Sequence, residues 1–290
     1  MMDPKALIQI LVQVSLIVLV AGFGLRARWS DLGAAFRNPG MLLRAILAVN
    51  IVVPLVASLM VWILPIDPLV KAGIVIMAVS PMAPFVMGKM LKAGASESYV
   101  FGLFVALILV AIVLVPVTIG LLSALTSVKV SVPVSDIAWL ALSSVILPLA
   151  AGVLVASVWP GAAARLAKVA NAVAFVILIP IIVLIVYKSG AGMLTLVGNG
   201  VLLAIVLAVA AGLAAGHLLG GPDAQQRMAL ASAASARHPG IALLIAKDDL
   251  DDPRVRLAIV LFLLTSIVVS GVYAAMVNKR LARAVGGVRG

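Results

Sequence analysis

The sequence has no cysteine, only two histidines and few charged residues. Of its 290 residues, 11% are charged and 64% are hydrophobic, and the mean hydropathy is +1.29. The absence of cysteine excludes disulfides and thiolate metal sites, and two histidines are too few for a histidine-rich metal centre. Soluble chains are about 45–50% apolar and about 25% charged. The shortage of charge therefore excludes an ordinary soluble protein and predicts an integral membrane protein.

The charge that is present is mostly positive, with 21 Lys and Arg against 10 Asp and Glu and a net charge of +11. In a membrane protein such an excess first indicates that basic loops gather on the cytoplasmic side. We therefore expect the lipid bilayer and a small molecule as partners, and no nucleic acid. The sequence does not indicate an oligomeric state.

Nine apolar stretches are each long enough to cross a bilayer as a helix, which takes about 20 residues. All connections between them are short, so we expect a single transmembrane domain over residues 1–290. The fold class is an all-α polytopic membrane protein. The predicted spans are 6–25, 41–64, 69–92, 98–122, 136–158, 167–187, 193–219, 224–247 and 254–277.

The loops indicate an orientation. With nine spans the two termini lie on opposite sides, and the side that carries the C-terminus has thirteen Lys and Arg against seven on the other. The positive-inside rule then places the C-terminus in the cytoplasm and the N-terminus outside. We expect a multi-pass protein, of the kind found in a bacterial inner membrane.

Two predicted spans are interrupted near their middle. The third contains Ser80-Pro81-Met82-Ala83-Pro84 and the eighth contains Ala236-Arg237-His238-Pro239-Gly240, and closely spaced prolines or Pro-Gly favour unwinding. Paired broken helices in two oppositely oriented halves are typical of secondary transporters, with the substrate site near mid-membrane. We therefore predict an inverted repeat of residues 6–122 and 167–277, joined by a connecting helix at 136–158.

Several motifs resemble those of the bile acid:sodium symporter superfamily, of which the chain is identified as a divergent, bacterial-type member. The matching residues are Phe23-Gly24-Leu25, Asp31-Leu32, Phe36, Pro39, Pro54-Leu55, the stretch from Ser80 to Gly94, and Ser235-Ala236-Arg237-His238-Pro239-Gly240-Ile241-Ala242. The resemblance implies a core domain of crossing broken helices and a panel domain that moves against it. It further implies transport of organic anions by alternating access, commonly coupled to sodium.

The positions that bind sodium in this family hold different residues here. The resemblance places Ala233 and Arg237 where the family has a glutamate and a glutamine, and Pro84-Phe85 where it has Ser-Asn. Ser98 matches a serine ligand, but the two remaining ligand positions hold Val49 and Gly102. We therefore predict that the usual sodium sites are lost, we expect no cofactor, and we regard bound sodium as doubtful.

Arg237 is a charged residue inside a predicted span, and such residues usually face a partner or a cavity. Three roles are open: its guanidinium replaces the family's bound cation, it binds an anionic substrate directly, or it only satisfies unwound carbonyls. The neighbouring His238 either couples transport to protons, because histidine changes charge near neutral pH, or is a polar lining residue.

The predicted site joins the two breaks with nearby polar side chains, each serine of which has the alternative of bonding to its own helix. The candidate substrate-binding residues are Asn50, Ser80, Pro81, Met82, Pro84, Phe85, Ser235, Arg237, His238, Pro239 and Gly240. The candidates for ion coupling are Ser98 and His238. We expect no metal-binding residues.

Other functions remain as alternatives. A sodium-coupled symporter with an atypical site, and a channel or sensor built on the same fold, fit the same helices. An intramembrane prenyltransferase would use Asp248, Asp249 and Asp252 to hold Mg²⁺ on a diphosphate. Such an enzyme needs a second acidic cluster, which the first half of the sequence does not offer, and HExxH and GxSxG patterns are absent. We therefore expect a transporter and not an enzyme.

Overall fold

A computed structural model describes residues 4–125, 133–246, 250 and 252–286. The structure is 86% helical, and the described residues form no strand beyond one isolated bridge. Six of the described helical stretches are long and apolar enough to cross a membrane. These findings confirm an all-α, multi-pass membrane protein, whereas the count of nine spans stays a prediction.

The first half of the chain contains the helices as far as residue 125. They are α1 (Pro4–Gly24), α2 (Trp29–Leu32), the 3-10 helix η1 (Ala34–Arg37), α3 (Pro39–Ile46), the π-helix η2 (Leu47–Val52), α4 (Val53–Ile63), α5 (Pro68–Val79), α6 (Val86–Lys92) and α7 (Glu97–Leu125). The gap between α5 and α6 lies at the first predicted break. The sequence did not lead us to expect α2 and η1, which follow α1.

The second half begins after residue 132. Its helices are α8 (Val134–Ala141), the π-helix η3 (Leu142–Ile146), α9 (Leu147–Val158), α10 (Pro160–Leu196), α11 (Val201–Leu219), α12 (Ala224–Ser235), α13 (Pro239–Ala246) and α14 (Pro253–Gly286). The gap between α12 and α13 lies at the second predicted break.

One predicted boundary is wrong. The predicted spans 167–187 and 193–219 leave a connection at residues 188–192, which contain Lys188, Gly190 and Gly192, but α10 continues through them to Leu196. Glycine lowers helix propensity without ending a helix. The chain turns instead at Asn199 and Gly200, which have φ angles of +44° and +86°, values in the left-handed region that glycine adopts readily.

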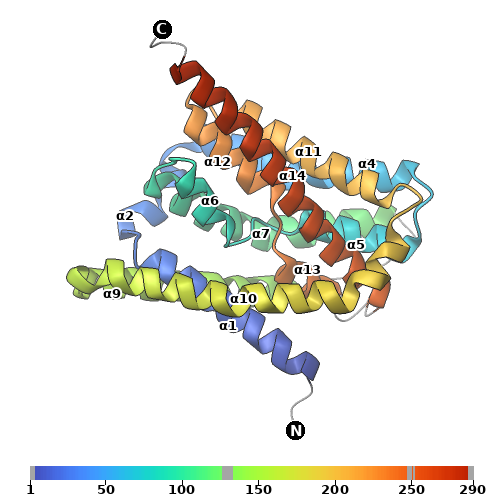
Figure 1. Cartoon of the computed structure of the whole chain (residues 1–290), viewed down its shortest axis with the longest axis horizontal. Coiled ribbons are helices and arrows are strands. Elements are labelled where there is room, and N and C mark those ends of the chain that lie inside the picture. The colour runs from blue at the N-terminus through green and yellow to red at the C-terminus, as the bar shows by residue number, and fades with distance from the viewer. Residues whose placement is uncertain (1–3, 126–132, 247–249, 251, 287–290) are drawn as a thin grey trace.

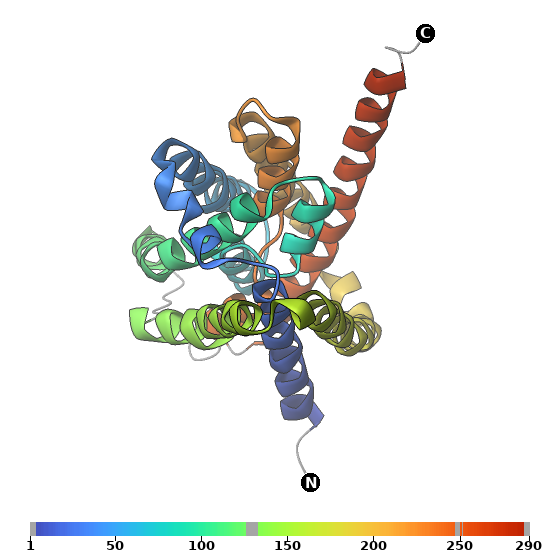
Figure 2. The same ribbon diagram turned by 90° about the vertical axis from the view of Figure 1, so that its left-hand side faces the viewer.

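The helices form two groups (Figures 1 and 2). Helices α1, α9 and α10 pack against one another along the lower side of both views, and most of the other helices lie above them. The buried apolar residues form two clusters: one is built from α4, α5, α11, α13 and α14, and the other from α1, η2, α6, α9 and α12. Helix α7 contributes its second half to the first cluster and its first half to the second. At each gap the chain passes from one cluster to the other, and the gap residues Met82, Ala83 and Ala236 belong to the second.

Small residues let helices touch at their backbones, as is usual between membrane helices. A Cβ atom on Gly216 of α11 would lie 2.5 Å from the Cα atom of Ala231 in α12. At the junction of α1 and α9, a Cβ on Gly152 would lie 2.3 Å from the carbonyl oxygen of Ala21. The position of α12, which leads into the second break, thus depends on a glycine in its neighbour.

Candidate functional site

The two breaks lie side by side near the centre of the molecule and bond to each other (Figure 1). Met82 and Arg237 form an isolated antiparallel bridge. The His238 N–H donates to the carbonyl of Pro81 at 2.8 Å, and the Ala83 N–H donates to the carbonyl of Ala236 at 3.3 Å. Unwound backbone at membrane depth must find partners inside the protein, and each break supplies them to the other.

Proline explains why the helices stop where they do. Ser80 ends α5 with φ and ψ of −59° and 144°, because the residue before a proline, here Pro81, is kept out of the helical region. Ala236 is extended after α12, with φ and ψ of −113° and 123°. Pro239 then begins α13, at the first helical position, where its missing N–H costs nothing.

Arg237 lies at the meeting point of the two half-helices that end here, α5 and α12, and is fully buried. Its Nη1 donates to the carbonyl of Ser80 at 3.2 Å, and its Nη2 donates to the carbonyl of Ala234 at 2.9 Å. These carbonyls belong to helix C-termini, which carry partial negative charge. The guanidinium therefore places a fixed positive charge where two negative helix ends converge.

The Arg237 guanidinium has bonding capacity left. Arginine offers five N–H donors, of which the structure uses one on each terminal nitrogen, and Nε has no partner among the described residues. An edge formed by Nε and one terminal nitrogen is the arrangement that binds a carboxylate with two parallel hydrogen bonds. Of the three roles open for Arg237, the structure shows hydrogen bonds to unwound carbonyls. These bonds leave other N–H groups of the guanidinium unpaired among the described residues, and those groups could bind an anion.

His238 is buried and caps α13. Its Nδ1 accepts a hydrogen bond from the backbone N–H of Ile241 at 3.3 Å, so Nδ1 carries a lone pair and the neutral ring carries its proton on Nε2. A Cβ on Gly240 would lie 3.1 Å from the His238 ring. The ring therefore covers the N-terminus of α13.

The other predicted site residues have different surroundings. Ser80 Oγ donates to Ile76 in its own helix at 2.9 Å, while Ser235 Oγ donates to Ser232 at 3.0 Å and accepts from Ser270 of α14 at 2.9 Å. Pro81, Met82 and Pro84 are buried, and Phe85, Pro239 and Gly240 are partly exposed. The breaks thus bring together the candidates from both halves, although the two serine hydroxyls have partners within the protein.

Asn50 lies on the π-helix η2, which packs against α12. Its side chain is buried, and its Oδ1 has no partner in the described part of the chain. Pro54 explains the π turn, because a proline leaves the carbonyl four residues earlier, here that of Asn50, without its helical partner. The side chain of Asn50 thus offers a buried, unpaired acceptor on an element that packs against α12.

The Ser98 side chain contacts the segment that follows α1. Its Oγ donates to the carboxylate of Asp31 in α2, and Asp31 also accepts the backbone N–H of Arg28 at 2.8 Å. A Cβ at Gly102, one turn along α7, would lie 2.8 Å from the Asp31 carbonyl. The two positions of α7 that the resemblance relates to sodium thus contact the α2–η1 segment, and Ser98 bonds to no residue of the breaks.

Asp31 and Ser144 are among the buried polar residues that sequence reasoning did not name as site candidates. Ser144 lies on the second π-helix, η3, and its Oγ has no partner among the described residues. It precedes Pro148 by four residues, as Asn50 precedes Pro54. A polar residue four positions before a proline could therefore have indicated the π-helices. By contrast, the residues four positions before Pro116 and Pro180 are apolar, and these two prolines lie inside regular α-helices.

The acidic group proposed for a prenyltransferase lies mostly outside the described residues, which exclude Asp248 and Asp249. Asp252 is described, and hydrogen bonds from Arg254 hold the pKa of its carboxyl below the usual range. Within the described part of the chain, no three His, Asp or Glu residues come close enough to hold a metal ion.

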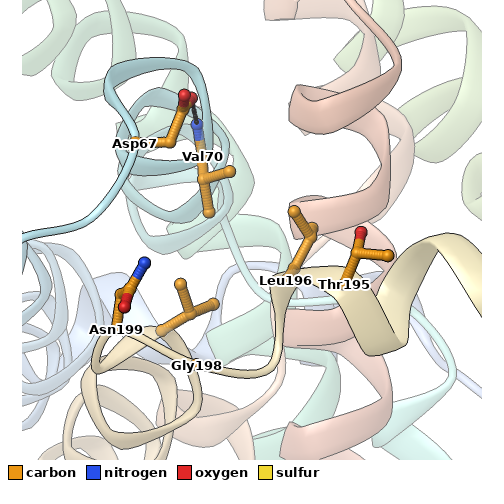
Figure 3. Close-up of a pocket in the computed structure, with 7 residues that line it drawn as sticks. Asp67, Val70, Thr195, Leu196, Gly198 and Asn199 are labelled. Atoms are coloured by element: carbon orange, nitrogen blue, oxygen red, sulfur yellow. Dashed lines mark hydrogen bonds between the residues drawn. The ribbon is translucent and has the colours of Figure 1, made fainter.

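A small pocket of about 80 Å³ lies between the start of α5 and the connection from α10 to α11 (Figure 3). Figure 3 shows Asp67 and Val70 opposite Leu196 and Asn199. The Asp67 carboxylate already accepts from the N–H groups of Leu69 and Val70 and from Arg254 at 3.0 Å. Because ligand pockets usually measure about 300–1,000 Å³, this one is too small for an organic anion.

Comparison with known proteins gives one match. Residues 13–196, more than half of the chain, match the model of the family described as the sodium bile acid symporter family. No curated protein matches the sequence significantly. The matched region begins within α1, extends to the end of α10 and includes the first break.

Proposed function

The chain belongs to the sodium bile acid symporter family, and from this premise we propose a secondary-active transporter of a small organic anion that works without sodium. Arg237 supplies the positive charge that sodium supplies in other members. The single observation that carries this proposal is the buried guanidinium bonded to the carbonyls of Ser80 and Ala234. In transporters with broken helices, unwound carbonyls and half-helix C-termini are the groups that hold the coupling cation.

Transport proceeds by alternating access in this proposal. Eight of the nine predicted spans form two inverted repeats joined by the span at 136–158, and α1, α9 and α10 belong to the panel that moves against the core. The residues of the breaks are mostly buried, so substrate reaches them only when the two groups of helices separate. The anion then binds to the free Nε edge of Arg237, with Asn50 and the partly exposed Gly240 nearby in the proposed site.

The test is a thermal-shift screen of purified wild-type protein and the Arg237→Gln variant against mono- and dicarboxylates and sulfonates. Each anion is tested in sodium chloride and in choline chloride at equal ionic strength. We expect at least one anion to stabilise the wild type equally in both salts and to lose its effect on the variant. Arg44→Gln, which removes an exposed arginine of α3, is the matched control and should behave as wild type.

A sodium-coupled symporter with an atypical site is the second candidate. The family match and the free Oδ1 of Asn50 favour it. Stabilisation that rises with sodium at constant ionic strength, and that falls in Asn50→Leu, would establish this candidate and contradict ours. Counterflow of labelled substrate in proteoliposomes then separates a carrier from a channel or sensor.

His238 is a capping residue in this proposal and does not carry protons. A proton added to Nδ1 would remove the hydrogen bond from Ile241 and expose the end of α13. Substrate-driven transport should therefore leave the internal pH of proteoliposomes unchanged, and an accompanying pH change that is lost in His238→Asn would assign the proton-coupling role to His238.

A further inference from the structure

A second, larger pocket of about 290 Å³ lies far along the chain from the breaks. One wall is the end of α1 and the connection to α2, and the other is the junction of α9 with α10, which lie together at the left edge of Figure 1. The lining residues are Leu25, Arg26, Ala27, Arg28, Trp29, Ala156, Ser157, Pro160 and Ala163. None of them belongs to the site described above.

The charge of this pocket is positive. Arg26 and Arg28 line it, and no lining residue is acidic. Arg26 is partly neutralised by Glu97, whose Oε1 accepts from its Nη2 at 2.8 Å and from its Nε at 3.2 Å. Arg28 is exposed and makes no ion pair within the described residues. At least one guanidinium is therefore free to bind an anion from outside.

The aromatic residues place the pocket at the surface of the bilayer. Trp29 lines it and is 53% exposed, and Trp159, the single residue between α9 and α10, is 65% exposed. Exposed tryptophans of membrane proteins gather at the level of the lipid headgroups. The neighbouring turns of α9 expose Leu154 and Val158, which gives acyl chains an apolar surface below the arginines.

We propose that this pocket binds the headgroup of an anionic phospholipid. The phosphate accepts hydrogen bonds from Arg28 and from the unpaired edge of Arg26, because arginine matches the geometry of phosphate oxygens. Basic pockets between membrane helices commonly bind such headgroups. The apolar surface of α9 beside the pocket favours a lipid over a free phosphate ion.

The bound lipid joins parts of the chain that are distant in sequence. Its headgroup touches the connection after α1 and the first turn of α10, and through Arg26 it is linked to Glu97 at the start of α7. Occupancy therefore holds the ends of α1, α9 and α10 together. This inference does not depend on the proposed function, because it involves neither Arg237 nor the breaks.

The test measures thermal stabilisation of the full-length protein in a neutral detergent by dioctanoyl phosphatidylglycerol, dioctanoyl phosphatidylcholine or inorganic phosphate. We expect half-maximal stabilisation by the anionic lipid at concentrations at least tenfold below those of the other two. Each basic residue near a membrane surface contributes about 1 kcal/mol to anionic lipid binding, so Arg28→Gln should weaken the effect about fivefold. Because the Arg28 guanidinium makes no ion pair with any of the described residues, this variant should fold normally.

Two control variants distinguish binding of the lipid in this pocket from a general attraction between the anionic lipid and the basic protein. Arg44→Gln removes the same charge outside the pocket, and Arg237→Gln removes it at the breaks; both should bind the anionic lipid as wild type does. An equal loss in Arg44→Gln and Arg28→Gln would show a diffuse electrostatic effect and overturn the proposal. Stabilisation by inorganic phosphate at the same concentration as the lipid would identify a free-anion site instead.

Discussion

At the scale of single residues, our proposal gives Arg237 two roles, replacement of a bound cation and binding of an anion, that are usually held by separate groups. A metal ion that binds helix C-termini leaves with the substrate, whereas an arginine stays with the protein. The bonds to Ser80 and Ala234 join the ends of the two half-helices through a side chain of the protein itself. In our proposal the transporter keeps the structure of the crossover but gives up the sodium gradient as a source of energy for transport.

Removal of the guanidinium should therefore destabilise the protein as well as prevent anion binding. Arg237→Met keeps much of the volume but leaves two buried carbonyls without donors, and each such group costs about 1–3 kcal/mol. We expect a clear fall in the midpoint of thermal unfolding in detergent, compared with no change for Arg44→Met. An unchanged midpoint would mean that water or another donor replaces the arginine.

The family's sodium ligands can be restored to test whether Arg237 replaces a bound cation. Ala233→Glu combined with Arg237→Gln introduces the two oxygen-bearing side chains that the resemblance assigns to these positions. We expect this double variant to be stabilised by sodium chloride more than by potassium chloride at equal concentration, and the wild type to respond equally to both. The same response of both proteins to both salts would contradict the idea that Arg237 occupies a cation site.

His238 offers a test of capping. Loss of an N-cap costs about 0.5–2 kcal/mol, and asparagine is among the best capping residues. His238→Ala should therefore lower the unfolding midpoint, and His238→Asn should retain most of it because its Oδ1 can accept from Ile241. Loss of transport in His238→Asn with unchanged stability would indicate a role beyond the cap.

At the scale of helices, the sequence predicts features that depend on neighbouring residues, such as breaks and helix ends. Proline and glycine placed both breaks correctly, and the apolar runs placed most helix ends. The error at residues 188–192 arose because a charged residue and two glycines mark a membrane boundary without ending a helix. At about 1.5 Å per residue, the 37 residues of α10 span about 55 Å, so this helix extends beyond a membrane core of about 30 Å.

The sequence does not predict contacts between residues that are far apart along the chain. Arg237 and Ser80 are 157 positions apart, and nothing near Arg237 in the sequence reveals which carbonyls its guanidinium meets. Ser98 was assigned to ion coupling by its position, but its partner Asp31 is 67 residues away in a short helix that we did not predict. The sequence therefore identified the residues of the crossover but not the bonds among them.

The close contact of α11 and α12 leads to a prediction at this scale. In Gly216→Leu the new side chain collides with the backbone of Ala231 and displaces α12, which carries Ser235 and leads to Arg237. We expect strong destabilisation and loss of anion binding, measured by fluorescence-detected size exclusion and thermal shift. Gly271→Ala in α14 is the matched control, because a Cβ there meets nothing within 4 Å. Since alanine favours helix by up to about 1 kcal/mol over glycine, this control should be neutral or stabilising.

At the scale of the whole molecule, the positive charge and the absence of cysteine together allow the orientation to be measured. Gly161 and Gly198 lie near opposite ends of α10, both are exposed, and a Cβ at either position meets nothing within 4 Å. A cysteine introduced at one of them is the sole thiol of the chain. A membrane-impermeant maleimide then reports which end of α10 faces outside.

The excess of basic residues predicts that Gly198→Cys is labelled in intact cells and that Gly161→Cys is labelled only after permeabilisation. The same result would place the pocket of Arg26 and Arg28 on the cytoplasmic side, where anionic lipids create a negative surface potential. The reverse pattern would invert the whole assignment and place both arginines outside. Labelling of both cysteines in intact cells would show that α10 does not cross the membrane, which would contradict the predicted repeat because two halves of opposite orientation require it to do so.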